Sequence, residues 1–280
     1  MTDRYVLFGN PVEHSPSPRV HAAFAAQTGQ DMTYDRLLVP LGEFAAAAGA
    51  FFAAGGRGGN VTLPFKADAH AFASRLTERA RRAGAVNTLA REEDGGVLGD
   101  NTDGVGLVRD LAANLGWTLA GRRVLVLGAG GATRGALGPL LEQRPALLHV
   151  ANRSADKAVA LAREFAELGT VTGSGFPELA AEPPFDLLIN ATSASLSGEV
   201  PPVPASALGA GCAAYDMMYG AAPTPFLRWA AEQGVAALAD GLGMLVEQAA
   251  ESFALWRGVR PQTAPVIAAV RAMLVEKAAH

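Results

Sequence analysis

Short runs of apolar, often β-branched residues alternate with longer alanine-rich stretches from one end of the chain to the other. Apolar runs of about four to eight residues are typical of buried strands, and the longer stretches are typical of helices. The alternation predicts an α/β protein with a mainly parallel sheet. Two blocks can be distinguished along the chain.

The first block is expected to open with a strand, and the second to follow a helix that joins the two blocks. The predicted elements of the first block are strands at 4–8, 33–38 and 60–62 and helices at about 18–28 and 41–54, with a glycine-rich turn at 55–59. The second block follows a predicted helix at about 104–116 and contains predicted strands at 123–127, 147–151, 187–191 and 213–216.

The tail from Asp240 forms a third feature, because its apolar residues recur at the spacing of one helix face. These residues are Leu242, Leu245, Val246, Ala249, Phe253 and Trp256. The periodicity predicts an amphipathic helix and leaves its docking site open.

Composition narrows the class of protein. The chain has 280 residues, 50% of them hydrophobic, which is enough core for one large domain or two ordinary ones. The single cysteine, Cys212, is interpreted as a small buried residue, and this low cysteine content suits a reducing compartment. A strand-like run at 5–8 leaves no room for a secretory signal, and no apolar stretch of about 18 residues lacks a charge or a breaker. We therefore expect a cytoplasmic protein with no membrane partner.

Charge gives no indication of a nucleic-acid partner, because the formal net charge is −4 and acids and bases are interspersed. The one basic cluster, Arg79, Arg81 and Arg82, lies in a predicted helix beside Glu78 and is interpreted as a solvated helix face. The five histidines have neither paired helical spacing nor neighbouring thiols. No metal site is expected.

A glycine-rich turn follows the predicted strand at 123–127 and opens a helix, which is the context of a dinucleotide-binding βαβ unit. Its residues are Gly128, Ala129, Gly130, Gly131 and Ala132. Gly128 permits the tight turn, Gly130 lets the backbone approach a pyrophosphate, and the first N–H groups of the helix point at that anion. Thr133 stands where the motif usually has a third glycine or alanine, which leaves close packing of this helix on the strand open.

The end of the next strand predicts which nicotinamide cofactor binds. An NAD site places a carboxylate here, about 20 residues after the glycines, against the ribose 2′-hydroxyl. This chain instead carries Asn152, Arg153 and Ser154, with Lys157 one helical turn later. Because Arg153 can bind a 2′-phosphate through two hydrogen bonds and Lys157 and Ser154 add donors, the pattern favours NADP. Asn152 and Ser154 also suit a structural role as helix caps.

Three polar clusters are candidates for a substrate pocket. They are the proline-stiffened loop at 9–18 with Ser15 and Ser17, the strand end at 60–66 with Thr62 and Lys66, and the segment 99–104 with Asp103. Each has a structural alternative, since serine and proline form turns, Lys66 suits a solvated surface, and Asp103 suits a helix cap.

Taken together, these motifs resemble the shikimate dehydrogenase family over nearly the whole chain. The resemblance rests on residues 14–18, 60–66, 84–88, 101–104, 128–134, 152–154, 190–193, 215–219, 224–227 and 240–249. It implies reversible reduction of 3-dehydroshikimate to shikimate with NADPH, a step toward aromatic amino acids. It also implies an N-terminal α/β substrate domain and a Rossmann-type doubly wound NADP-binding domain, with the C-terminal helix returning to the substrate domain. The implied domains are 1–103 with 240–280, and 104–239.

The resemblance also implies a set of site residues. Lys66 and Asp103 are the implied catalytic pair, which agrees with the need for a proton donor to the developing alkoxide. The resemblance implies that neutral hydroxyl donors, rather than an arginine, meet the substrate carboxylate. The implied substrate residues are Ser15, Ser17, Thr62, Asn87, Tyr219 and Gln248. The implied cofactor residues, besides the glycine turn and Asn152, Arg153, Ser154 and Lys157, are Glu78, Asn190, Thr192, Met217 and Gly241.

Two departures from the family pattern lie in loops. Ser195 replaces a glycine after the Asn190–Ser193 run, and Gly220 with Ala221 replaces an Asn-Pro pair after Tyr219, so the backbone course there is open. A quinate/shikimate dehydrogenase that also takes NAD is the nearest alternative, and Arg153, Lys157 and Ser17 argue against it. A catalytically silent NADP-sensing protein is a second alternative. Monomer and homodimer both remain open.

Overall fold

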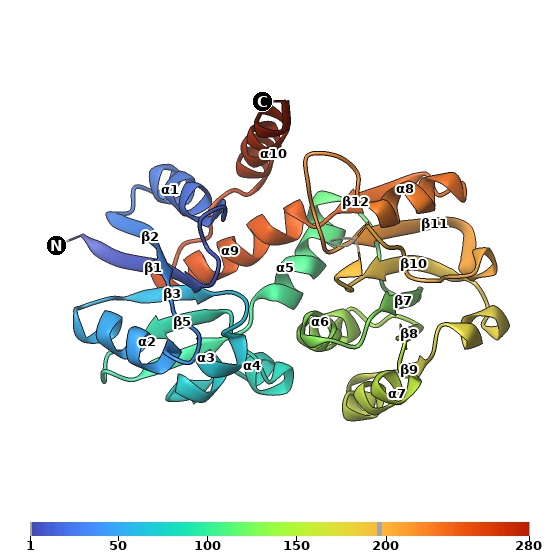
Figure 1. Cartoon of the computed structure of the whole chain (residues 1–280), viewed down its shortest axis with the longest axis horizontal. Helices are drawn as coiled ribbons and strands as arrows, with labels where there is room; N and C mark the ends of the chain where they lie inside the picture. The colour runs from blue at the N-terminus through green and yellow to red at the C-terminus, as the bar shows by residue number, and fades with distance from the viewer. Residues whose placement is uncertain (1, 195–197, 280) are drawn as a thin grey trace. The chain divides into compact units, whose positions relative to one another are not determined.

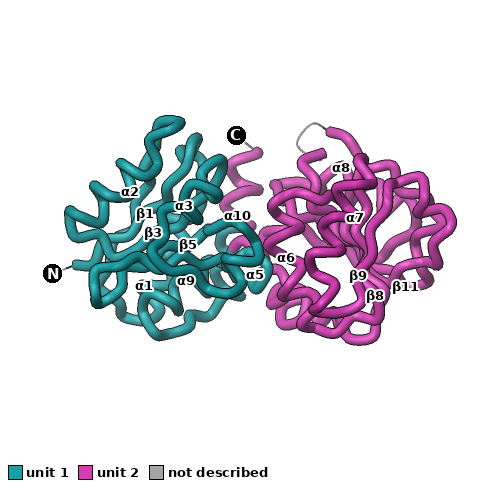
Figure 2. Tube along the Cα trace, turned by 90° about the horizontal axis from the view of Figure 1, so that it is seen from below, with its two compact units in different colours: residues 1–106, 246–270 teal, residues 107–245, 271–280 magenta. Residues whose placement is uncertain are grey.

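The computed structural model describes residues 2–194 and 198–279, and these form two compact units. Unit 1 consists of residues 1–106 and 246–270, and unit 2 of residues 107–245 and 271–280 (Figure 2). The chain crosses between them inside the helices α5 (Asp103–Arg109), α9 (Leu242–Arg257) and α10 (Ala264–Ala279). Both units combine a sheet with helices, so the expected α/β class is confirmed (Figure 1).

The sheet of unit 1 is mixed. Its strands lie in the order β2–β1–β3–β5–β6–β4, with parallel pairing on either side of β1 and antiparallel pairing of β5 with both neighbours. The strands are β1 (Asp3–Gly9), β2 (Met32–Leu38), β3 (Gly58–Val61), β4 (Arg75–Leu76), β5 (Thr88–Arg91) and β6 (Val97–Asp100). The helices that accompany them are α1 (Ser17–Thr28), α2 (Phe44–Ala53), α3 (Lys66–Phe72) and α4 (Glu78–Ala83). Since β1 has parallel neighbours on both sides, the loops after β1 and β3 leave the same edge of the sheet.

Aromatic side chains fill the two faces of this sheet. On one face, the ring of Phe8 from β1 meets Phe44 and Phe51 of α2 edge-on, with centroids 5.6 and 5.5 Å away. The other face receives α9, where Phe253 packs on Phe24 with ring centroids 5.6 Å apart. Trp256 donates to the carbonyl of Leu89 at 3.0 Å. The tail helix therefore returns to the first block, as the family resemblance implies.

The sheet of unit 2 is parallel throughout, in the order β12–β11–β10–β7–β8–β9. Its strands are β7 (Arg123–Leu127), β8 (Leu147–Ala151), β9 (Val171–Ser174), β10 (Phe185–Asn190), β11 (Leu208–Asp216) and β12 (Ala237–Asp240). Its remaining helices are α6 (Gly131–Glu142), α7 (Ala155–Glu164) and α8 (Pro225–Glu232), with short 3₁₀ turns at 166–168, 177–181 and 205–207. The strand order reverses direction between β7 and β10, which is the switch point where doubly wound sheets bind ligands.

Most predicted strands and helices are confirmed within a few residues, and β7 and β8 have the predicted bounds. One prediction needs correction, because the helix expected at about 104–116 is α only to Arg109 and continues as a π-helix at Asp110–Asn114. The carboxyl group of Asp110, which is buried at this transition, accepts a hydrogen bond from the Tyr215 hydroxyl at 2.7 Å. The helix therefore changes from α to π at a residue whose side chain is buried against Tyr215 of β11.

The boundaries of the compact units lie a few residues from the predicted domain boundaries near residues 103 and 240. In addition, residues 271–280 of the tail belong to unit 2 and not to unit 1. Arg271 of α10 donates to the carbonyl of Gly220 at 2.7 Å and also pairs with Asp240, which ties the end of this helix to unit 2. Since compactness reports packing alone, the assignment of domains to substrate and cofactor stays a prediction. Among the described helices, none is both long and apolar enough to span a membrane.

Candidate functional site

The polar centre of unit 1 is the contact between Lys66 and Asp103. Lys66 Nζ donates to Asp103 Oδ2 at 2.5 Å, and the two side chains are 29% and 16% exposed. Lys66 begins α3 just after β3, and Asp103 begins α5 just after β6. Because neither side chain is fully buried, the pair remains accessible to a ligand.

The structural alternatives for these two residues, a solvated surface position for Lys66 and a helix cap for Asp103, are both wrong. Lys66 is not a solvated surface residue, since its ammonium group is held by a carboxylate. Asp103 is not the cap of α5, because the Asn101 side chain accepts from the Asp103 backbone N–H at 3.2 Å. Asn101 therefore satisfies the helix terminus and leaves the Asp103 carboxylate for Lys66.

Asn87, which is 2% exposed, orients this pair from the end of the segment before β5. Its Nδ2 lies 2.8 Å from Asp103 Oδ1, 2.9 Å from Thr102 Oγ1 and 3.2 Å from Gln248 Oε1. Its Oδ1 accepts from the Thr102 backbone N–H at 2.9 Å. One amide thus connects the carboxylate to Gln248 on α9, which brings together four of the predicted site residues.

A buried hydrogen-bond network lies behind Asn87. Asn60 Nδ2 is within donor distance of the Asn87 carbonyl at 3.2 Å, Thr88 Oγ1 at 3.1 Å and Ser252 Oγ at 2.9 Å. Asn60 Oδ1 accepts from the Tyr34 hydroxyl at 2.8 Å and from the His21 ring at 3.2 Å. Burial lowers the pKa of His21 to about 3, so this ring is neutral. The network fixes the backbone that carries Asn87.

The prediction of a solvated basic face on α4 is wrong for Arg79. Arg79 forms a two-armed contact with Asp100, in which Nε lies 2.7 Å from Oδ1, and it also reaches Glu251 on α9 at 3.2 Å. Burial alone raises the pKa of Asp100, but the hydrogen bonds and charge of Arg79 outweigh it and hold that pKa below its usual value. Arg81 is exposed, as expected, and pairs with Glu78 of the same helix.

Ser15 lies in the loop between β1 and α1, and its hydroxyl oxygen is 3.1 Å from that of Ser17. The Ser17 backbone N–H also donates to Ser15 Oγ at 3.3 Å, and Ser17 begins α1. Two hydroxyls at the start of a helix of 12 residues suit a carboxylate ligand, because the helix dipole adds to their donors. Thr62, which follows β3, lies against the end of β1, since its methyl would meet a Cβ placed on Gly9 at 2.4 Å.

Unit 2 carries the glycine turn at its switch point. Gly128 has φ +100, a conformation that favours glycine, and a Cβ there would meet the methyl group of Thr192 at 3.0 Å. Gly130 precedes α6, and a Cβ on Gly130 or Gly131 would meet nothing within 4 Å, so the backbone faces open space. This geometry fits a pyrophosphate at the helix N-terminus.

Thr133, at the third position of the glycine motif, is accommodated in the fold. Its side chain is fully buried, and its hydroxyl donates to the carbonyl of Gly128 at 2.7 Å. The hydroxyl therefore finds a backbone partner inside the turn, and the fold accommodates Thr133 at this position without a glycine or alanine.

A pocket of about 510 Å³ opens beside the glycine turn. Its lining includes the turn residues 128–132, Asn152, Arg153, Phe176, residues 191–194 and residues 199–202. Asn152 Oδ1 accepts from the backbone N–H of Ala129 at 3.3 Å, so it supports the turn. Ser154 precedes α7 without a side-chain cap, and the exposed side chains of Arg153 and Lys157 contact no described residue through a hydrogen bond or ion pair.

A second cluster borders the switch point after β10. Asn190 Oδ1 accepts from the Thr192 hydroxyl at 2.7 Å, while Asn190 Nδ2 donates to the buried carboxylate of Asp216 at 3.1 Å. A Cβ on Gly241 would meet the carbonyl oxygen of Met217 at 2.1 Å, so only glycine allows this approach of β12 to the end of β11. These contacts bring Asn190, Thr192, Met217 and Gly241 to one edge of the sheet.

The remaining predicted residues have varied surroundings. Tyr219 is half-buried, and burial, together with the charge of Asp240, raises its pKa. Glu78 forms exposed ion pairs with Arg81 and Arg82, which suits the structural alternative as well as a cofactor contact. Ser195 lies outside the described residues. The roles of these residues stay predictions.

Two chemistries find no support in the described residues. No group of three or more histidine, cysteine, aspartate or glutamate side chains there is arranged to hold a metal ion. Cys212 is 4% exposed, and burial raises its pKa to about 11, so its thiol is not activated. The interpretation of Cys212 as a buried small residue is confirmed.

Sequence reasoning missed side chains that support Asn87 and Asn60. Thr102 and Ser252 both contact the Asn60–Asn87 network, and neither was assigned a role. The spacing of Ser252 four residues after Gln248 on one helix is the signal that could have found it. Asn60 and Tyr34 are far apart in the sequence, so no local signal joins them.

Comparison with known proteins agrees with this geometry. The family model of the shikimate dehydrogenase substrate binding domain matches residues 7–89, and that of shikimate / quinate 5-dehydrogenase matches residues 110–197. The model of the shikimate 5′-dehydrogenase C-terminal domain matches residues 241–271.

Relatives and solved structures match over nearly the whole chain. The chain is 56% identical to the shikimate dehydrogenase (NADP(+)) of Cellvibrio japonicus, over 99% of this chain and 100% of that protein. An Ael1 enzyme from Pseudomonas putida has a TM-score of 0.91 at 48% identity, covering 95% of this chain and 97% of that one. Shikimate 5-dehydrogenase of Thermus thermophilus, in complex with NADP(H) and shikimate, has a TM-score of 0.85 at 34% identity, covering 97% and 99%. The chain therefore belongs to the shikimate dehydrogenase family.

Proposed function

We propose that this protein reversibly reduces 3-dehydroshikimate to shikimate with NADPH. The observation that carries the proposal is the Lys66–Asp103 contact of 2.5 Å, oriented by Asn87, in a chain whose glycine turn suits a dinucleotide. Relatives named shikimate dehydrogenase (NADP(+)) support the same substrate and cofactor. The proposal assigns a proton-transfer role to the pair and a recognition role to the polar residues around it.

Reduction of the ketone needs a hydride at the carbonyl carbon and a proton at its oxygen. Hydride transfer is the chemistry that NADP(H) supplies when bound. The Lys66 ammonium group gives its proton to the developing alkoxide and so completes the alcohol, while the Asp103 carboxylate keeps the ammonium group oriented. In the oxidation of shikimate, the Lys66 amine takes that proton back.

The substrate is a cyclic acid with one carboxylate and several hydroxyls, and the polar residues divide between these groups. We assign Ser15 and Ser17 to the carboxylate, because their hydroxyls place two donors at the start of α1. Thr62, Asn87 and Gln248 are assigned to the ring hydroxyls, and Tyr219 to a further substrate contact. Asn87 and Gln248 share a hydrogen bond of 3.2 Å, which a substrate hydroxyl can replace at little cost.

Residues of unit 2 are assigned to the cofactor. The glycine turn would hold the pyrophosphate, and Arg153, Ser154 and Lys157 would hold the 2′-phosphate, since their exposed donors meet no described acid. Asn152 supports the turn, Asn190 and Thr192 border its far side, and Met217 and Gly241 are assigned to the nicotinamide end. Glu78 stays a proposed cofactor contact.

The functional domains follow from these roles. We assign residues 1–103 and 240–280 to the substrate domain and residues 104–239 to the NADP-binding domain. A cytoplasmic location and the choice between monomer and homodimer stay predictions of the sequence, supported by the single cysteine for the former.

Steady-state kinetics with purified protein test the proposal. We expect shikimate-dependent formation of NADPH, with the highest kcat/KM for shikimate and NADP among the four pairings of shikimate or quinate with NADP or NAD. A higher kcat/KM for quinate with NAD would favour the quinate/shikimate alternative, whose name the matched family model also carries. Absence of NADPH formation with shikimate would favour the silent NADP-sensing alternative.

A further inference from the structure

The proposed carboxylate site is built from neutral groups. Ser15 and Ser17 supply hydroxyls, and the start of α1 adds a partial positive charge. A carboxylate that leaves water loses hydration, and neutral donors restore less of that free energy than a charged partner does. A cation beside this loop would therefore change the affinity for an anionic substrate.

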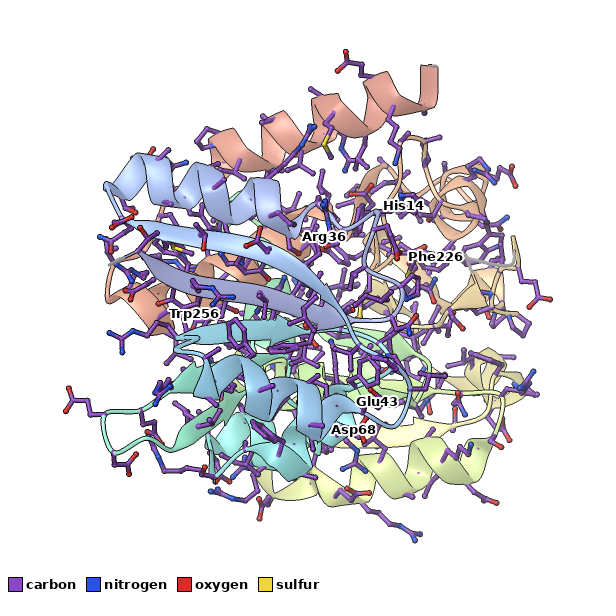
Figure 3. All side chains as sticks on the ribbon, turned by 60° about the vertical axis from the view of Figure 1, so that its left-hand side comes forward. His14, Arg36, Glu43, Asp68, Phe226 and Trp256 are labelled. Atoms are coloured by element: carbon purple, nitrogen blue, oxygen red, sulfur yellow. The ribbon has the colours of Figure 1, made fainter. Side chains whose placement is uncertain are left out.

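Arg36 is such a cation. It lies near the carboxyl end of β2, and its Nη2 donates to the backbone carbonyl of Ser15 at 2.6 Å. Figure 3 labels Arg36 and His14, which both lie by the loop between β1 and α1. Since Tyr34 and Arg36 are two residues apart on one strand, they share the face of the sheet that also carries the Asn60 network.

The guanidinium group of Arg36 retains capacity for a ligand. Its hydrogen bond to Ser15 uses one of five N–H donors, and none of the described residues forms an ion pair with it. The nearest acid in the loop sequence, Glu13, instead accepts from the Val12 backbone N–H at 3.1 Å. The positive charge of Arg36 is thus not neutralised within the described protein.

We propose that Arg36 is a specificity-determining residue for the substrate carboxylate, because it fixes the Ser15 carbonyl and puts a full positive charge beside the serine pair. This inference rests on the proposed function and deepens it. It predicts a preference for substrates that carry a carboxylate, and it predicts that this preference weakens as salt screens the charge.

Three substitutions separate the two contributions of Arg36. Arg36→Gln keeps a donor for the Ser15 carbonyl and removes the charge, Arg36→Lys keeps the charge, and Arg36→Leu removes both. For Arg36→Gln we expect KM for shikimate to rise about three- to tenfold at low salt, with kcat changed less than about twofold. Arg36→Lys should retain most of the affinity for shikimate. In Arg36→Leu, KM for shikimate should rise at least as much as in Arg36→Gln.

Varying the charge of the substrate and the salt concentration tests the role of the Arg36 charge, because a merely structural role of Arg36 would not make the change in KM depend on either. KM for the uncharged methyl ester of shikimate should be the same for wild type and Arg36→Gln, and the difference for shikimate should shrink at high salt. Arg4→Gln, an exposed arginine at the opposite end of β1, is the matched control and should leave KM unchanged.

If the wild type is active and Arg36→Gln has the same KM for shikimate, this inference is overturned and the proposed function is not. Equal rises in KM for shikimate and its methyl ester would overturn it as well, since they would indicate a displaced loop instead of a lost charge. A wild type that forms no NADPH from shikimate would overturn the proposed function and this inference together.

Discussion

Replacement of Lys66 by alanine removes the proposed proton donor and leaves the rest of the polar centre in place. Asp103 keeps its hydrogen bond from Asn87 Nδ2 at 2.8 Å, so its carboxylate is not left without a donor. The hydrogen bonds that join Asn87 to Gln248 and Asn60 to Ser252 do not involve the lysine. The substitution therefore tests one group and not the fold.

The expected magnitudes for activity and stability differ strongly. A positioned general acid contributes about 10² to 10⁴ in rate, which corresponds to about 2.7 to 5.5 kcal/mol of transition-state stabilisation. The folded protein loses far less, because the ion pair is partly exposed, at 29% and 16%, and exposed pairs contribute about 1 kcal/mol or less. We expect kcat to fall about 10²- to 10⁴-fold, with little change in KM or in the free energy of unfolding.

The assay is steady-state formation of NADPH from shikimate, combined with urea unfolding of the same samples. Lys277→Ala, an exposed lysine near the end of α10, is the control for loss of a lysine and should be unaffected. The double variant of Lys66→Ala and Asp103→Asn should have about the same kcat as the slower single variant, because the effects of substituting two groups that act as a unit do not add. A rise in KM at constant kcat would refute the reasoning and make Lys66 a binding residue.

Further predictions concern the cofactor, the fold and pH. Arg153→Gln should weaken NADP binding by about 1–3 kcal/mol and leave NAD binding nearly unchanged, and calorimetry showing equal losses would contradict the 2′-phosphate role. Arg79→Gln should destabilise the protein by about 3 kcal/mol in urea unfolding, because Asp100 is 1% exposed, whereas the exposed Arg81→Gln should cost less than about 1 kcal/mol. Because folding lowers the pKa of Asp100, its charged form stabilises the fold at pH values above its ordinary pKa of 3.8, and this stabilisation is lost as the pH falls below that value. In Asp100→Asn, the free energy of unfolding should therefore decline less steeply in acid than in the wild type. Gly241→Ala should raise KM for NADP, since its Cβ would meet a backbone carbonyl at 2.1 Å, and unchanged kinetics would contradict the close approach.

Local chemistry determined much of what the sequence could predict. The strand and glycine turn at 123–131 were predictable because a buried strand, a tight turn and a helix start each have their own residue preferences within a few positions. The same holds for the absence of a carboxylate at 152–154. Membership of the family followed from motifs spread along the chain in a fixed order, and the comparisons bear this out.

Tertiary structure decided which side chains meet. Arg79 looked like a surface residue because its helix neighbours are charged, and only the approach of β6 and α9 gave it Asp100 and Glu251 as partners. The π-helix at Asp110–Asn114 likewise begins at a residue whose partner, the Tyr215 hydroxyl, is 105 positions away in sequence. Local propensity carries no information about partners at that separation.

The sequence by itself determined the fold class and the cofactor type, and it predicted which residues carry the chemistry. Only the tertiary structure decided how they are oriented: Asn87 contacts both Asp103 and Gln248, the latter 161 positions away in sequence, and Arg36 reaches the Ser15 carbonyl from a neighbouring strand. The physical reason is that residue type and spacing set what a side chain can do, whereas hydrogen bonds of about 3 Å depend on packing of the whole unit.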